Sequence, residues 1–285
     1  MNAADLPLGI RYGVPSEQYH ACTLSVSKSG LDALERSPYH YWATRLDPNR
    51  PPAPEPTPAM VLGTMTHCAV LEPGCFDSRY AVAPKCDRRT KDGKAAWAAF
   101  VETLAPGQEP ADPEMVTQAR AMAASVMQIR PVADLLRSGH AEVSAYWIDN
   151  DSGVLCRCRP DWVSPAGDGV ILFDLKSAID ASPKGFARAV ANWNYAKQAA
   201  MYSDGWEAAT GQHVYGFVFG AVEKDHPFAA AAYMLDDEAL EQGRRQYRRN
   251  LRTLAECRRA DVWPGYTLGD QIQLLQLPRW ALEFA

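Results

Sequence analysis

Two aspartates and a lysine stand where a folded chain normally packs apolar side chains. The stretch RPDWVSPAGDGVILFDLKS, residues 159–177, places Asp161 at the end of one apolar run and Asp174 and Lys176 inside the next. Burying an unpaired charge is costly unless the group is neutralised. Residues two apart on a strand project from the same face, so Asp174 and Lys176 lie together. The turn residues PAGDG bring the preceding strand, with Asp161, alongside them.

Two carboxylates and one ammonium that converge at a sheet edge predict a metal site. Acids this close repel each other unless a cation lies between them. Oxygen ligands favour Mg²⁺ or Mn²⁺. A neighbouring lysine orients or helps to deprotonate a water molecule, or stabilises charge that develops on a phosphate. The alternative is structural, with Asp161 capping a turn and Asp174 and Lys176 forming a partly exposed salt bridge.

Several motifs, in their order along the chain, resemble those of one nuclease superfamily. The pattern P-D-x(12)-D-x-K, from Pro160 to Lys176, resembles the PD-(D/E)XK signature. GTMTH (63–67) resembles the G-x-x-x-H motif of the RecB-like branch, and KQAAMY (197–202) resembles its Q-x-x-x-Y motif. Three further segments are similar to the RecE (exonuclease VIII) family of phage recombination exonucleases: SVSKSGLDALERSPYHYW, DRRTKDGKAAW and AVEKDHPF. The resemblance covers most of the chain.

The resemblance implies a role for each matching residue. The metal ligands would be His67, Asp161 and Asp174, assisted by the carbonyl of Leu175. Lys176 would position the attacking water. Two residues one helical turn apart, and so on one helix face, would contact the DNA backbone or support the site: Gln198 and Tyr202.

Each of these assignments has a structural alternative. His67 on an apolar helix is also compatible with a satisfied core histidine, and Gln198 and Tyr202 with an ordinary helix face. Glu142, in the strand before Asp161, matches an acid often found there in such nucleases, and whether it reaches a metal stays open. Lys28, in the first RecE-like segment, is a further candidate DNA contact.

The cysteines distinguish this chain from relatives that carry an iron–sulfur cluster. AddB- and Cas4-like nucleases place several cysteines near the C-terminus, whereas Cys257 is alone there. A four-cysteine cluster therefore cannot form. Cys156 and Cys158 form only a C-x-C pair, which favours core thiols over a zinc site. A Walker A sequence is absent, so we expect no ATP-driven motor.

Basic residues cluster in two places although the net charge is −5. One flexible loop holds Arg88, Arg89, Lys91 and Lys94. A helix near the C-terminus holds Arg244, Arg245, Arg248, Arg249, Arg252, Arg258 and Arg259. Such clusters are typical of a DNA track. The alternative is a solvated helix surface or, for the second cluster, a subunit interface.

The elements that position these residues predict an α/β protein with the PD-(D/E)XK nuclease fold, a central mixed β-sheet flanked by helices. Turn signals separate three strands, AEVSAYWID, GVLCRCRPDWVSP and GVILFDLKSA. One helix is expected across 183–211, then strands at 214–224 and 229–235 and a helix from Asp236 to about Ala260. This order predicts one central sheet.

The N-terminal part is expected to be helical, and we divide the chain into three regions. A helix over 25–46, which Ser25 or Ser27 could cap and Pro38 should end or kink, precedes an exposed proline-rich linker, DPNRPPAPEPTP. A second helix covers 59–75. The predicted regions are 1–58 (helical segment and linker), 59–265 (nuclease core with a helical insertion at 76–140) and 266–285 (tail).

Composition is ordinary for a soluble globular protein, with 47% hydrophobic and 22% charged residues. No apolar run reaches the roughly 20 residues that span a bilayer, and the N-terminus lacks signal-peptide features, so we expect a cytoplasmic protein without membrane contact. The expected activity is a Mg²⁺-dependent 5′→3′ exonuclease on double-stranded DNA ends, leaving 3′ single strands for an annealing protein. The alternatives are an inactive DNA-binding module and an endonuclease. The RecE resemblance further implies a ring of subunits, four rather than three.

Overall fold

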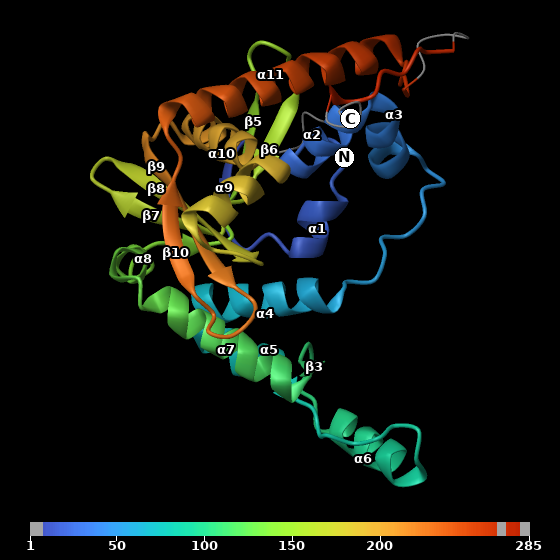
Figure 1. Cartoon of the computed structure of the whole chain (residues 1–285), viewed down its shortest axis with the longest axis vertical. Helices are drawn as coiled ribbons and strands as arrows, with labels where there is room; N and C mark the ends of the chain where they lie inside the picture. Colours follow the sequence, from blue (N-terminus) through green and yellow to red (C-terminus); the bar gives the residue numbers. More distant parts are fainter. Residues whose placement is uncertain (1–7, 267–271, 280–285) are drawn as a thin grey trace.

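The computed structural model describes residues 8–266 and 272–279 (Figure 1). Its α-helices are α1 (Ser16–Ala21), α2 (Lys28–Arg36), α3 (Pro38–Tyr41), α4 (Pro58–Leu71), α5 (Phe76–Arg79), α6 (Lys91–Glu102), α7 (Pro113–Met127), α8 (Arg130–Leu135), α9 (Pro183–Asn192), α10 (Tyr195–Thr210) and α11 (Asp237–Ala260). Its strands are β1 (Gly9–Arg11), β2 (Tyr80–Val82), β3 (Glu109–Ala111), β4 (His140–Ala141), β5 (Ser144–Ile148), β6 (Leu155–Cys158), β7 (Trp162–Ala166), β8 (Gly169–Ala178), β9 (Val214–Glu223) and β10 (Ala230–Met234).

The strands form a mixed central sheet and two smaller sheets. The central sheet has the order β10-β9-β8-β7-β4, in which β8 and β9 are parallel and the other neighbours are antiparallel. A second sheet has the order β1-β5-β6, and β2 pairs with β3. The predicted mixed α/β architecture with a central sheet is therefore confirmed. The predicted order is wrong in one respect, because β5 and β6 lie in the second sheet instead of the central one.

The split into two sheets occurs at residues 159–161, inside the segment predicted as one strand. β6 ends at Cys158 and pairs with β5, while β7 begins at Trp162 and pairs with β8. Pro160 lacks the N–H that a ladder hydrogen bond requires, so pairing stops there. Arg159 is buried and donates from Nε to the Ser144 hydroxyl at 2.9 Å. The chain changes sheets just before Asp161.

Two hydrophobic clusters cover the two faces of the central sheet. On one face, Leu172 and Phe219 join a cluster that includes residues of α2, α10 and α11. On the other face, Phe173 and Leu175 pack with residues of α4 and α7. Figure 1 shows α11 along one side of the molecule and α4 and α7 along the opposite side. The helices thus enclose the sheet as two layers.

The helical segment predicted for 183–211 is two helices. α9 ends at Asn192, and Asn194 has a left-handed backbone with a φ of 53° before α10 begins. Lys28 Nζ donates to the carbonyl of Trp193 at 2.6 Å, which satisfies a backbone acceptor at the end of α9. The prediction of one helix is therefore wrong at this junction.

Other predicted elements are confirmed. The break expected at Pro38 lies between α2 and α3, where the Ser37 hydroxyl accepts from the backbone N–H of His40. Ser27 occupies the N-cap position of α2, although its hydroxyl contacts Ser29 rather than a backbone N–H. The helix predicted for 59–75 is α4. The proline-rich residues 50–57 are exposed and lie outside helices and strands.

The long C-terminal helix also follows the prediction. α11 begins after Asp236, whose carboxylate accepts from the backbone N–H of Ala239 at 2.8 Å, and it ends at Ala260. α11 crosses α10 so closely that a Cβ atom at Gly243 would lie 2.2 Å from the carbonyl oxygen of Ala196. Only glycine allows this approach.

The seven cysteines are free, and four of them are buried: Cys68, Cys156, Cys158 and Cys257. Cys156 and Cys158 are core thiols on β6, as predicted. Within the described residues, none of the helices combines the length and the apolar character that a membrane crossing requires. The region predicted as a tail, 266–285, is described only at 266 and 272–279.

Candidate active site

The β7–β8 hairpin brings Asp161 beside Asp174. Trp162 on β7 pairs with Phe173 on β8, so the residue before β7 lies next to the middle of β8. Asp161 Oδ2 accepts a hydrogen bond from the backbone N–H of Leu175 at 2.7 Å. The carboxylate of Asp161 is thereby fixed on the main chain between Asp174 and Lys176.

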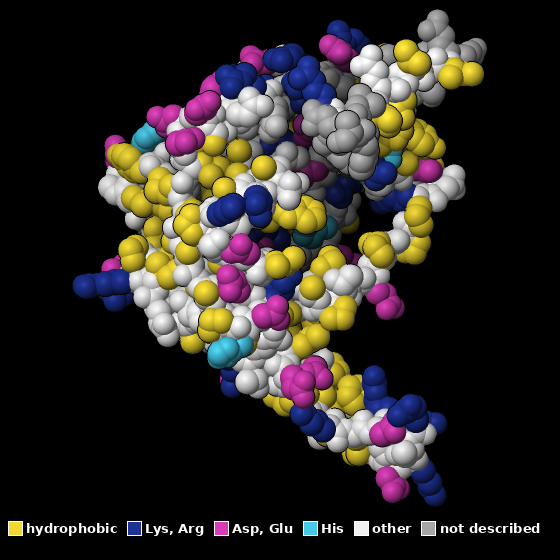
Figure 2. All heavy atoms as spheres, in the orientation of Figure 1, with side chains coloured by type: hydrophobic (Ala, Val, Ile, Leu, Met, Phe, Trp, Pro, Cys, Tyr) yellow, Lys and Arg dark blue, Asp and Glu magenta, His cyan; other side chains and the backbone are white. Residues whose placement is uncertain are grey.

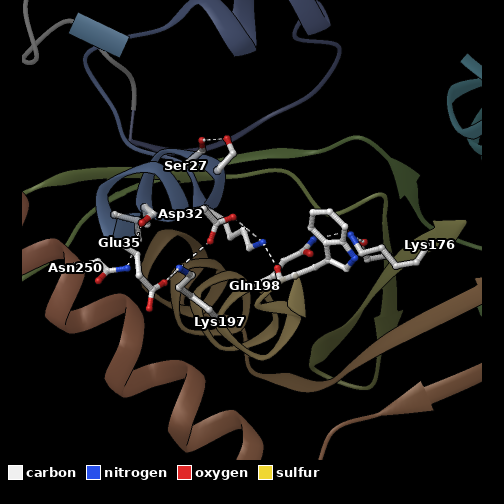
Figure 3. A network of polar contacts seen from close by, with 12 residues as sticks. Ser27, Asp32, Glu35, Lys176, Lys197, Gln198 and Asn250 are labelled. Atoms are coloured by element: carbon white, nitrogen blue, oxygen red, sulfur yellow. Dashed lines mark hydrogen bonds and ion pairs between the residues drawn. The ribbon is translucent and has the colours of Figure 1, made fainter. Parts of the chain in front are cut away.

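Asp174 and Lys176 lie on the face of β8 that α10 covers. Asp174 is 2% exposed, and its Oδ1 forms an ion pair with Lys176 Nζ. Its other oxygen, Oδ2, accepts a hydrogen bond from Gln198 Nε2 on α10 at 2.5 Å. Figure 3 shows Gln198 reaching from α10 toward the side of the sheet where Lys176 lies. The common face expected from the strand period is therefore present.

Asp174 has few partners for a buried carboxylate. Lys176 Nζ contacts Oδ1 and Gln198 Nε2 donates to Oδ2, so each oxygen has one partner, whereas a carboxylate offers about four acceptor sites. Burial, and then the charge of Asp161, raise the pKa of Asp174 to about 6. Two carboxylates this close, with acceptor sites still free, form an arrangement that a cation would complete.

His67 reaches this site from α4, which covers the face of the central sheet opposite to α10. Its Nδ1–H donates to the carbonyl of Gly63 at 2.8 Å, and its Nε2 lies 3.0 Å from Asp161 Oδ2. Burial alone lowers the pKa of His67, but the Asp161 carboxylate outweighs it and raises the pKa to about 9. At neutral pH the ring is therefore an imidazolium whose Nε2–H faces Asp161, and a metal would take Nε2 only with loss of that proton. The hydrogen bond at Nδ1 makes Nε2 the nitrogen that would bind.

The side chains are not arranged as a ready-made metal cage. In the part of the chain that the structure describes, no three His, Cys, Asp or Glu side chains form such a group. His67 is turned toward Asp161, and Asp174 toward Lys176 and Gln198. The residues still fit a hard divalent cation, because they offer two carboxylates and, after deprotonation of His67, one imidazole nitrogen.

Lys176 remains an ammonium in this surrounding. Burial alone lowers the pKa of Lys176, but Asp174 and Asp161 outweigh it and hold the pKa above its usual value. Its Nζ also lies 4.7 Å from the centre of the Tyr195 ring. A protonated lysine can stabilise negative charge that develops on a phosphate and can orient a water molecule.

Glu142 lies beside Asp161 but not on a strand. It follows β4 in a left-handed conformation, with a φ of 54°, and its N–H donates to the carbonyl of Asp161 at 3.1 Å. Burial and the charge of Asp161 raise the pKa of Glu142 to about 7. Its carboxylate lies 3.5 Å from Arg159. The predicted strand position of Glu142 is therefore wrong. The residue lies in the connection between β4 and β5, next to Asp161.

The two residues of the Q-x-x-x-Y motif have different surroundings. Gln198 contacts Asp174 directly, so its amide supports the carboxylate. Tyr202, one turn later on α10, packs edge-on against Phe217, with ring centres 6.1 Å apart. Burial raises the pKa of Tyr202 well above its usual value, with added contributions from Tyr19 and Asp174. The phenol is thus held in neutral form near the site.

Comparison with known proteins identifies the domain to which this arrangement belongs. Residues 27–277 match the family described as "PDDEXK-like domain of unknown function (DUF3799)". The chain belongs to the DUF3799 family. The predicted PD-(D/E)XK superfamily and fold are therefore confirmed, whereas the narrower RecE-like assignment stays a prediction.

One solved structure has the same fold as this DUF3799 protein. A crystal structure described as a "putative exonuclease" from Eubacterium rectale matches with a TM-score of 0.60 and 15% identity, over 96% of this chain and 99% of that one. A second structure, described as SSO0001, reaches a TM-score of 0.29 at 14% identity, over 67% of this chain and 85% of that one, and carries no argument. No curated protein matches the sequence.

Several residues of the DUF3799 site escaped the sequence analysis. Lys197 is fully buried and forms ion pairs with Asp32 at 2.7 Å and Glu35 at 2.5 Å, both on α2 (Figure 3). Tyr195 lies under Lys176. Tyr195 and Lys197 both belong to α10, the helix that carries Gln198. Their closeness in sequence to the Q-x-x-x-Y motif was the signal that could have identified them.

Lys28, predicted to contact DNA, lies close to the site but is engaged within the protein. Its Nζ lies 2.8 Å from Asp32 and donates to the Trp193 carbonyl. Burial lowers the pKa of Lys28, and Asp32 partly offsets this effect. Lys28 therefore connects α2 to the junction between α9 and α10.

The loop predicted to bind DNA lies away from the site. Arg88, Arg89 and Lys91 belong to the projection that carries α6, and Figure 2 shows dark blue side chains at its tip. Arg88 stacks on Trp97, 4.4 Å from the ring centre, and Arg89 pairs with Asp87 at 3.0 Å. Any contact of this loop with DNA would occur far from Lys176.

The basic helix α11 directs many of its arginines to acids of its own fold. Arg244 forms two hydrogen bonds with Asp204 of α10, at 2.7 and 2.8 Å. Arg249 lies 3.2 Å from Glu35 of α2. Acidic side chains are interspersed with basic ones along this edge in Figure 2. These contacts favour the structural alternative for α11 over a DNA track.

Proposed function

We propose that this DUF3799 protein is a divalent-metal-dependent deoxyribonuclease. The observation that carries the proposal is the convergence of Asp161, Asp174 and Lys176 with Gln198 and His67 at one end of the central sheet. Phosphodiester hydrolysis needs a positioned water molecule and positive charge near the phosphate. The two carboxylates, with the imidazole of His67 and the carbonyl of Leu175, would hold Mg²⁺ or Mn²⁺, which lowers the pKa of a bound water.

The residues of the chain have distinct roles in this proposal. Lys176, an ammonium on the same strand face as Asp174, orients the attacking water and faces the phosphate. Gln198 holds Asp174 through the hydrogen bond to Oδ2. Gly63 fixes the imidazole of His67 through Nδ1. Because Glu142 contacts the backbone of Asp161, it supports the position of that ligand.

Within this activity, we propose a 5′→3′ exonuclease that acts on double-stranded DNA ends and leaves 3′ single strands. The support is the RecE resemblance and the likeness in fold to a protein described as an exonuclease. The product would suit a single-strand annealing protein. A closed ring of four subunits would keep the enzyme on DNA, because a duplex threaded through a ring cannot dissociate sideways.

Linear and covalently closed circular duplexes, incubated with the protein and Mg²⁺, test this proposal. Loss of the linear duplex alone is expected. Cutting of both substrates would indicate an endonuclease, and cutting of neither an inactive DNA-binding module. A linear duplex labelled at one 5′ end or one 3′ end gives the polarity, since early release of the 5′ label is expected. EDTA and the Asp174→Ala variant serve as controls for contaminating nuclease.

A further inference from the structure

A groove of about 520 Å³ opens directly beside Lys176. It lies between the end of β8 and helix α9, and its lining includes Lys176, Ile179, Arg188, Trp193 and Lys224. This volume falls in the range of roughly 300–1,000 Å³ typical of ligand pockets. The groove is therefore large enough for a nucleotide next to the proposed site of cleavage.

Two large apolar side chains of this groove are exposed to solvent. Trp193 is 64% exposed and Ile179 is 88% exposed. On the neighbouring helix α9, Phe186 is buried in the core, so α9 does not lack an apolar face to bury. An exposed tryptophan that lines a pocket beside charged residues marks a contact surface for a ligand.

The backbone of Trp193 is fixed although its indole is exposed. Its N–H donates to the carbonyl of Ala189 at 2.9 Å, and its own carbonyl accepts from Lys28 Nζ at 2.6 Å. Asn194 then turns the chain into α10 through a left-handed conformation. A side chain on such a fixed backbone can receive a flat ligand with little additional ordering cost.

The charged side chains around Trp193 are mainly cationic. Arg188 on α9 is exposed, and Lys224, directly after β9, also lines the groove. Asp180 is the acid among the lining residues, and its Oδ1 accepts from the N–H of Ser182 at 2.9 Å. Flat apolar surface flanked by cations is the composition that binds single-stranded nucleic acid, because bases stack on aromatic rings and cations contact phosphates.

We propose that this groove is a base-stacking subsite, in which Trp193 carries one base of the DNA strand beside the phosphate that Lys176 faces. Arg188 and Lys224 contact the neighbouring phosphates. The inference rests on the proposed function, because it takes DNA as the ligand. Stacking does not read base identity, since every base has a π-face, so the subsite accepts any sequence.

Fluorescence of 2-aminopurine, placed at each of the first three positions from a DNA end, tests the stacking directly. Ca²⁺ replaces Mg²⁺ to slow cleavage, and a gel verifies that the DNA stays intact. Stacking on an indole quenches 2-aminopurine, so the wild-type protein should quench it at one position. Trp193→Ala should lose the quenching and Trp193→Phe should keep part of it. Tyr215→Ala removes a 52% exposed aromatic at the far end of β9 and should behave like wild type.

Affinity for the same DNA, measured by fluorescence anisotropy, separates base contacts from phosphate contacts. Trp193→Ala should weaken binding about 5- to 100-fold, and an abasic nucleotide at the quenched position should remove this difference. Arg188→Ala should weaken binding to both DNAs equally. It should also reduce the slope of log affinity against log salt concentration by about one, as expected for the loss of one phosphate contact.

The outcomes distinguish the two proposals. If the wild-type protein binds the DNA but Trp193→Ala neither weakens binding nor abolishes quenching, the subsite is wrong while the nuclease proposal stands. If the wild-type protein does not bind DNA ends at all, the nuclease proposal itself fails. Quenching that persists equally in Trp193→Ala would place the base elsewhere on the protein.

Discussion

The two oxygens of Asp174 serve different partners. Oδ2 accepts a hydrogen bond from the Gln198 amide, whereas Oδ1 pairs with the Lys176 ammonium. A neutral group therefore positions one oxygen, and a charged group contacts the other. This division separates the residues that position the carboxylate from the groups that would take part in the reaction.

Asp174→Ala should reduce cleavage to below about a tenth of the wild-type rate, because loss of a metal ligand leaves no activated water. DNA binding should survive, since the cationic contacts remain. Cleavage of labelled linear duplex and anisotropy of the same DNA measure the two effects. Asp151→Ala, at an exposed turn between β5 and β6, is the matched control. A variant with more than a tenth of wild-type turnover would refute the assignment.

Lys176→Ala should abolish or nearly abolish turnover while metal affinity stays largely unchanged. The lysine pairs with Asp174 but donates no electron pair to a cation, so its loss removes catalytic charge and no ligand. Calorimetric titration with Mn²⁺ measures the affinity. Loss of Mn²⁺ binding in this variant would show that Lys176 builds the site rather than acts in it.

His67→Ala should weaken Mn²⁺ binding at least roughly tenfold, the lower limit for loss of a supporting residue in metal sites. The protein should remain folded, because the His67 side chain is 30% exposed and contacts Asp161 rather than a purely apolar neighbourhood. Circular dichroism and calorimetry provide the readouts. If the variant unfolds while affinity per folded molecule is unchanged, His67 is a core residue and not a ligand.

At the scale of elements, α10 is held to α2 by a lysine that solvent does not reach. Lys197 is 0% exposed and lies between Asp32 and Glu35 of α2. The next residue on α10 is Gln198, which contacts Asp174. The position of the amide at the candidate active site therefore depends on an ion-pair cluster at the adjacent residue of the same helix.

Lys197→Met should destabilise the protein by about 2–3 kcal/mol, because it leaves two acids without their buried partner. The loss is smaller than the 3–5 kcal/mol typical of fully buried pairs, since the side chains of Asp32 and Glu35 are 33% and 26% exposed. Urea denaturation measures the change. Lys91→Met, an exposed lysine on α6, should shift stability by less than about 0.5 kcal/mol. A stabilised Lys197→Met variant would contradict the prediction.

The sequence predicted the elements with strong periodicity and missed those decided by tertiary contacts. The strand period placed Asp174 and Lys176 on one face, and PAGDG correctly marked the β7–β8 turn. The separation of β6 from β7 depends on Arg159, which turns into the core toward Ser144. The break between α9 and α10 depends on Asn194, stabilised by the contact between Lys28 and Trp193. Contacts 165 residues apart leave no local pattern.

The contacts of the candidate site were predictable only in part. The structure places His67 beside Asp161, while the ligand set that the motif resemblance implied stays a prediction. The hydrogen bond from Gln198 to Asp174 was not predicted, because a helix face does not indicate which strand it covers. Lys197 was overlooked for a related reason, since a lysine in a helix is normally read as exposed.

At the scale of the molecule, several apolar side chains near the C-terminus are exposed to solvent in the single chain. Ile272 is 102% exposed, Leu274 92% and Leu275 87%. Exposed apolar groups in sequence are typical of surfaces that contact another protein. They are compatible with the proposed ring, in which a neighbouring subunit would cover them.

Light scattering at micromolar concentration should give the mass of an assembly, with four subunits expected and three as the nearest alternative. Closed cyclic symmetry is the usual form of soluble homo-oligomers. The double change Leu274→Glu and Leu275→Glu should shift the protein toward smaller species, because charges would enter the proposed contact. A monomeric wild-type protein that leaves DNA ends after a single turnover would refute the ring.

Strand β8 separates the two hydrophobic clusters and belongs to both. Leu172 packs on the α10 side, while Phe173 and Leu175 pack on the α4 side. Asp174 and Lys176 alternate with these residues. Because loosening either cluster would expose β8, the two layers are energetically coupled and should unfold in one cooperative transition. The strand that carries the candidate catalytic groups is therefore among the last parts of the molecule to open.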